Sequence, residues 1–176
     1  MTNQETTIKK VGEWLKKFHF IKLKFKTSFL EAEFDMKEDD KDAAWAMYVQ
    51  LITRITTQTL NPEDGDEKTA LDSVYSLFKT TRDILTEKGR KAQNFSKIAV
   101  AILNQVVRPF TAKWHKLSLN DAFNNPEQCL QFRQELQALQ LELRDYSAML
   151  AEIADVEDIC NVFPNEDEND QLFPME

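Results

Sequence analysis

The chain has 176 residues, 42% of them hydrophobic, and a formal net charge of −8. This length suits a single domain with a sizeable core. Three glycines and five prolines are too few for a turn-rich β-sandwich, so the composition favours long helices. Two cysteines cannot build a disulfide framework, and no apolar run reaches the roughly 20 residues that a membrane helix needs. We therefore expect a cytoplasmic protein with neither a signal peptide nor a membrane span.

Positive and negative charges gather at opposite ends of the chain. Residues 1–26 hold seven lysines against two glutamates, a balance of +5, whereas residues 155–176 hold eight acidic and no basic side chains. The chain as a whole therefore lacks the broad basic surface that releases counterions from nucleic acid. This distribution disfavours nucleic acid as a partner, with the N-terminal lysines as a small exception.

The N-terminal segment changes its hydrophobic period after residue 19. Residues 5–18 carry apolar side chains at helical spacing, which predicts a short amphipathic helix. Over residues 20–35 apolar and charged side chains alternate, which predicts a β-hairpin that turns at Thr27 and Ser28. When paired residue numbers sum to 55, lysines oppose glutamates and apolar side chains oppose each other. A lone hairpin is marginally stable in water, so it must lie on the first helix, the bundle or a partner.

Capping residues and apolar stripes predict three helices in the middle of the chain. Asp66 is a suitable N-cap for the second of them, and Gly89 suits its end. Pro109 falls inside the third and should kink or break it. The three helices are expected over about 40–60, 67–88 and 91–116.

The longest helix is predicted to begin at Asn125, Pro126 and Glu127, which supply a cap, a proline at the first helical position and an early acid. From there apolar residues recur at alternating spacings of three and four, a heptad seam. The seam consists of Cys129, Phe132, Leu136, Leu139, Leu143, Tyr146, Leu150 and Ile153. It forms either one wall of an antiparallel bundle within the chain or a coiled-coil dimer face. The residues from Phe132 to Leu150 are therefore candidate interaction residues.

These patterns predict a mainly α fold, a bundle of about five helices with an N-terminal β-hairpin at 20–35. The single domain is expected to span residues 1–156. Residues 157–176 are acidic, contain two prolines and lack positive charge, so we expect a disordered C-terminal tail. Phe163 and Phe173 are apolar residues in this tail that could act as docking motifs.

Catalytic motifs are absent from the sequence. Three glycines cannot form a phosphate-binding loop, and the two histidines, His19 and His115, are far apart. The cysteines lack zinc-site spacing, and no pair of Glu-x-x-His motifs of a di-iron bundle occurs. We therefore predict no catalytic residue, no metal site and no cofactor.

A polar stripe interrupts the otherwise apolar central helix. It comprises Lys97, Asn104, Arg108, Thr111 and His115, whose spacings place them on one face. Together with Lys113, this stripe suggests an anion-binding site beside the helix irregularity expected at Pro109. The candidate residues are Asn104, Arg108, Lys113 and His115. The alternative is structural: basic side chains near a helix C-terminus complement its dipole, and Arg108 pairs with an acid on another helix.

Three sequence blocks resemble blocks of a known protein family: TRITTQ at 53–58, GDEKTALDSVYSLF at 65–78 and LNQVVRPFTAKWH at 103–115. Over about residues 29–155 the chain resembles a family of small, mainly helical bacterial proteins. This resemblance implies a helical fold and brings no established activity or site residues. Families of this sort are associated with multi-protein bacterial systems, including phage defence.

Two hypotheses about function follow. In the first, the protein is a non-enzymatic interaction or regulatory subunit whose partner is another protein or a second copy of itself. In the second, it is a helical enzyme or ligand sensor that binds an anionic, phosphate-bearing ligand at the stripe containing Arg108 and His115. Burial distinguishes them, because side chains that converge in a pocket favour the second and a flat, solvated face favours the first.

Overall fold

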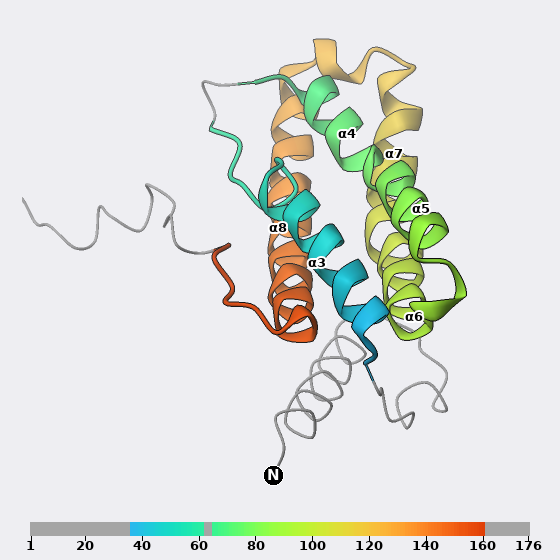
Figure 1. Cartoon of the computed structure of the whole chain (residues 1–176). Helices are drawn as coiled ribbons and strands as arrows, with labels where there is room; N and C mark the ends of the chain where they lie inside the picture. Colours follow the sequence, from blue (N-terminus) through green and yellow to red (C-terminus); the bar gives the residue numbers. More distant parts are fainter. Residues whose placement is uncertain (1–35, 62–64, 161–176) are drawn as a thin grey trace, which may run out of the picture.

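The computed structural model describes residues 36–61 and 65–160, and these residues form a packed bundle of four helical segments (Figure 1). Successive segments run in opposite directions, so the bundle is antiparallel. The segments are α3 (Glu38–Ile52), α4 and α5 (Glu67–Tyr75 and Leu77–Lys88), α6 and α7 (Gln93–Ile102 and Arg108–Ser118), and α8 (Pro126–Ala154). The predicted mainly α fold is confirmed. The predicted N-terminal helix and β-hairpin lie outside the described residues.

The core lies between α8 and the three other segments. The helix α8 packs most extensively on α3, and its heptad seam from Phe132 to Ile153 is buried there. At the other end of the bundle, aromatic rings join α7 to α8. Phe132 contacts Phe110 at 5.4 Å and Trp114 at 5.1 Å between ring centroids. The seam is therefore used in packing within the chain.

The helix starts agree with the sequence better than the helix ends. Asp66 caps α4 by accepting from the amide of Thr69 at 2.8 Å, and Asn125 caps α8 by accepting from that of Glu127 at 2.9 Å. The helix expected over 40–60 ends at Ile52. The helix expected over 67–88 divides at Ser76, whose hydroxyl donates to the carbonyl of Ser73 and accepts from Arg54.

Pro109 does not break the central helix. Instead, five residues before α7, Leu103–Val107, form a π-helical turn, in which the amide of Arg108 donates to the carbonyl of Leu103. Proline has no N–H, and its ring collides with the carbonyl four residues earlier. A widened turn directly before Pro109 moves that carbonyl and lets the helix continue to Ser118.

A buried carboxylate joins the N-termini of α3 and α6. Asp40 is 1% exposed, and one of its oxygens accepts from the amides of Asn94 at 3.0 Å and Phe95 at 2.9 Å. The other oxygen accepts from the amide of Lys37 at 3.2 Å. The first amides of a helix have no partner within it, so one side chain satisfies amide groups at two helix starts.

The opposite end of α3 is held by α8. After Ile52 the chain forms an irregular turn, and the hydroxyls of Thr56 and Thr57 both donate to the carbonyl of Leu51 at 2.9 Å. The amide of Gln140 on α8 donates to the carbonyls of Ile55 at 2.7 Å and Gln58 at 2.6 Å. These bonds satisfy backbone carbonyls that a longer α3 would have satisfied internally.

The chain remains packed for a few residues after α8. Ile159 donates its amide to the hydroxyl of Tyr48 at 2.7 Å, and that hydroxyl donates to Asp158 at 3.1 Å. Burial raises the pKa of Tyr48, and Cys160 is buried. The packed part of the described chain therefore continues past α8 to Cys160. Residues 161–176 lie outside the described part. No helix among the described residues is long and apolar enough to span a membrane.

Replacing Asp40 tests the junction between α3 and α6. Asp40→Ala leaves three amides without their acceptor, so we expect the free energy of unfolding to fall by roughly 2–4 kcal/mol. The matched control is Asp39→Ala, which removes a neighbouring carboxylate of the same helical turn and should cost less than about 1 kcal/mol. Urea denaturation of both variants measures the difference. Equal losses would mean that Asp40 acts only through its charge.

Removing the hydroxyl should change the stability of the protein differently at the two buried tyrosines, Tyr48 and Tyr146. The Tyr146 hydroxyl is buried without a hydrogen-bond partner among the described residues, and burial raises its pKa. Tyr146→Phe should leave the free energy of unfolding unchanged or raise it by about 1 kcal/mol, because it removes an unsatisfied polar group. Tyr48→Phe breaks two hydrogen bonds and should lower it by about 1–2 kcal/mol. Thermal and urea denaturation measure the stability of both variants. A marked loss of stability in Tyr146→Phe would mean that the Tyr146 hydroxyl has a hydrogen-bond partner.

Candidate functional site

The π-helical turn and α7 carry the residues that the sequence singles out. Such turns are frequent at functional sites, because they re-aim the side chains that follow. Here the turn precedes Arg108, Lys113 and His115. Arg108 and His115 face α5 and α4, Lys113 faces α8, and each side chain contacts a different residue.

Arg108 lies on an exposed face beside α5. Its Nε donates to Oδ1 of Asn104 at 2.9 Å, and its guanidinium lies 5.0 Å from the ring centroid of Phe78. The amide of Asn104 in turn donates to the carbonyl of Val100 at 3.0 Å. Arg108 is thus held by an amide and an aromatic ring, and it has no ion pair among the described residues.

His115 packs against α4. Its ring lies 4.7 Å from that of Tyr75, at an interplanar angle of 83°. Its Nε2 is buried and has no hydrogen-bond partner among the described residues. A ligand in solvent cannot reach this nitrogen without a rearrangement of the side chains around it.

Lys113 points to the α8 side of α7. It forms an ion pair with Glu135, and its ammonium lies 4.9 Å from the ring centroid of Trp114. The indole of Trp114 donates to the same carboxylate at 3.0 Å. Burial acts to raise the pKa of Glu135, but hydrogen bonds from Lys113, Trp114 and Gln131 outweigh it and lower that pKa. The ion pair is therefore a polar bridge between α7 and α8.

The structure thus brings together only part of the candidate anion site. Asn104 and Arg108 are hydrogen-bonded to each other, His115 packs on Tyr75, and Lys113 forms an ion pair with Glu135. No pocket is formed by these four side chains among the described residues. Thr111, also part of the stripe, is buried and donates to the carbonyl of Val107 at 3.0 Å.

A groove of about 470 Å³ lies between α7 and α8, beside the π-helical turn. Its floor is apolar and its rim is polar or charged. Val106, Phe110 and Leu139 form the floor and are buried; Pro109 and Ala138 are exposed at its edge. The remaining lining residues are Gln105, Lys113, Glu135 and Glu142.

Sequence reasoning did not find this groove. Glu135 and Glu142 directly precede the seam residues Leu136 and Leu143, so they occupy one flank of the heptad seam, the flank that faces α7. Gln140 and Arg133 directly follow seam residues and occupy the opposite flank. The heptad register identifies both flanks, but only the packed bundle assigns a neighbour to each.

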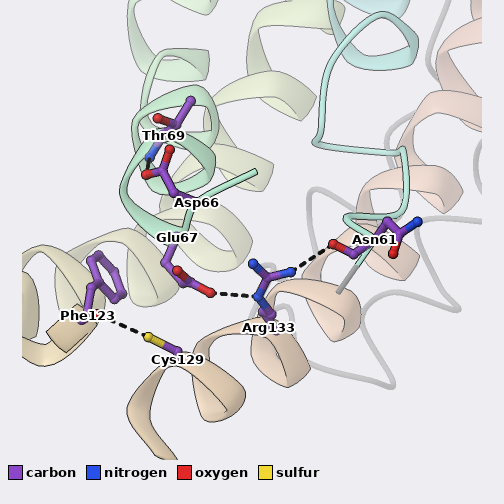
Figure 2. A network of polar contacts seen from close by, with 7 residues as sticks. All are labelled: Asn61, Asp66, Glu67, Thr69, Phe123, Cys129 and Arg133. Carbon is purple, nitrogen blue, oxygen red and sulfur yellow. Dashed lines mark hydrogen bonds and ion pairs between the residues drawn. The ribbon is translucent and has the colours of Figure 1, made fainter. Parts of the chain in front are cut away.

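The opposite flank forms a second polar network, shown in Figure 2. Nε of Arg133 donates to Glu67 at 2.6 Å, and Nη1 donates to the carbonyl of Asn61 at 3.0 Å. The nearby thiol of Cys129 donates to the carbonyl of Phe123 at 3.3 Å. Burial raises the pKa of Cys129, and the negative charge of Glu67 raises it further. Burial thus favours the protonated thiol, and the network joins α8 to the start of α4.

The three sequence blocks meet in the folded protein. Arg54 of the first block hydrogen-bonds Ser76 of the second. Tyr75 and Phe78 of the second contact His115 and Arg108 of the third. The polar residues of these blocks therefore hold α3, α4, α5 and α7 against one another.

Comparisons of the chain with protein-family models, with curated proteins and with solved structures found no match.

Proposed function

We propose that the protein is a non-enzymatic interaction or regulatory subunit, and that a partner protein binds in the groove between α7 and α8. The observation that carries this proposal is the composition of the groove. Its floor is formed by Val106, Phe110 and Leu139, and its rim carries charges of both signs. Apolar grooves with polar rims bind amphipathic helices through a few apolar anchors.

The dimensions of the groove support a helical ligand. From Gln105 to Lys113 the groove follows nine residues of helix, about 12 Å from first to last. Two turns of a bound helix have the same length and present apolar side chains at positions i, i+3 or i+4, and i+7. The ion pair between Lys113 and Glu135 bridges α7 and α8 at the rim, and Glu142 adds a negative charge. We infer a partner helix with one apolar face and basic flanking residues.

The arrangement of the stripe supports an interaction role over catalysis. General acid–base or nucleophilic chemistry needs side chains within hydrogen-bond reach of one substrate. Arg108 lies on an exposed face, the His115 Nε2 is covered, and Lys113 is neutralised by Glu135. The resemblance to small bacterial helical proteins adds a proposal about process, a subunit of a multi-protein bacterial system such as phage defence.

A charge placed at the edge of the groove tests the proposal. Ala138→Glu adds a carboxylate at an exposed position of α8 that lines the groove, and it should abolish co-purification of the partner from the native host. Ala148→Glu is the matched control, because it makes the same change at an exposed position of the same helix outside the groove. Both variants should keep the wild-type melting temperature. Equal partner recovery with both variants would reject the groove as the binding site.

A second candidate function, binding of an anionic ligand, rests on the fixed guanidinium of Arg108. Asn104 and Phe78 hold this side chain, and a pre-oriented guanidinium binds phosphate or carboxylate through two parallel hydrogen bonds. If Arg108 binds a phosphate-bearing ligand, Arg108→Lys should weaken calorimetric binding of inorganic phosphate about tenfold while the melting temperature changes little. No measurable phosphate binding by the wild-type protein would remove this candidate.

A further inference from the structure

The outward face of α8 is unusual in a chain in which 30% of residues are charged. Between Glu127 and Asp145 the exposed positions of α8 carry no charge; they are Leu130, Gln131, Gln134, Gln137, Ala138 and Leu141. Leu130 and Leu141 are 60% and 59% exposed at the two ends of this stretch. Gln134 and Gln137 lie exposed between them. This outer face of α8 is therefore defined by Leu130, Gln134, Gln137 and Leu141.

These four residues have the same order and the same spacing whether the sequence is followed from Leu130 to Leu141 or from Leu141 to Leu130. Leu130 and Gln134 are four residues apart, Gln134 and Gln137 three, and Gln137 and Leu141 four. A two-fold axis between residues 135 and 136 would place each leucine against the other leucine of a second copy, and each glutamine against the other glutamine. Two-fold interfaces require a surface that is complementary to itself in this way.

We propose that two copies of the chain associate through this face, with their α8 helices antiparallel. Leu130 of one copy packs on Leu141 of the other at both ends, and the glutamines form amide hydrogen bonds at the centre. The four residues of this face carry no charge, which favours the contact, since none of them must lose the hydration of a charge. The groove between α7 and α8 shares none of its lining residues with this face, so the contact is distinct from the proposed partner site.

The contact is expected to be weak. Two helices that touch over three turns bury less than the roughly 1,000 Å² typical of stable interfaces. The full chain should therefore be monomeric at low micromolar concentration and dimerise as its concentration rises toward about 1 mM.

Sedimentation equilibrium of the full chain tests the surface. Leu130→Gln with Leu141→Gln should raise the dimer dissociation constant at least about tenfold, because it removes both leucine–leucine contacts. The control Leu119→Gln changes a leucine that is 86% exposed outside α8 and should leave the constant within about twofold. A chain that stays monomeric up to about 1 mM, or equal effects of the two substitutions, would overturn the proposal.

Charge substitutions at the centre test the antiparallel orientation. In the proposed dimer residue 134 faces residue 137 of the second copy. Gln134→Glu with Gln137→Lys then creates two attractive pairs and should lower the dissociation constant, whereas Gln134→Glu with Gln137→Glu should raise it. In a parallel dimer each residue would face the same residue of the second copy. Like charges would then oppose each other in the first variant as well, and its dissociation constant would also rise. Weakening by both variants would overturn the antiparallel arrangement.

Discussion

The bundle depends on satisfying the backbone polar groups at the two ends of α3. This helix lies along α8, and polar side chains at both of its ends, Asp40 at the start and Thr56 and Thr57 after the end, are buried. Asp40 supplies acceptors at the start, and it does so for α6 as well as for α3. Gln140 supplies donors at the end, from the middle of α8. Each of these side chains is buried, so each fixes the position of a second segment relative to α3.

The heptad seam of α8 explains how the other contacts are arranged. The seam is buried, and the residues on its two flanks reach different neighbours. One flank carries Gln140 and Arg133, which bind the turn after α3 and the start of α4. The other flank carries Glu135, which binds Lys113 and Trp114 on α7. The groove lies on this second flank, where the π-helical turn and Pro109 change the contour of the helix beside α8.

The polar residues in the three sequence blocks are largely used to hold the fold together. Arg54, His115 and Lys113 each contact a side chain of another segment. Positions that remain available for a partner are less polar: the floor of the groove and the outer face of α8. A protein of this kind would act by presenting two surfaces, one for a partner helix and one for a second copy of itself.

The sequence by itself determined the helical class, the helix starts at Asp66 and Asn125, and the heptad seam of α8; only the structure showed that the seam is buried within the chain. These features depend on local capping chemistry and on a period of 3.6 residues, which a single sequence expresses directly. It could not determine where helices end when the terminating groups come from elsewhere, as at Ile52, where α8 supplies the hydrogen bonds. Only the tertiary structure assigned neighbours to these side chains: Lys113 pairs with Glu135 on α8, whereas Arg108 and His115 contact Phe78 and Tyr75. The groove was likewise decided by packing, since its lining joins residues of two helices that are about 30 positions apart in the sequence.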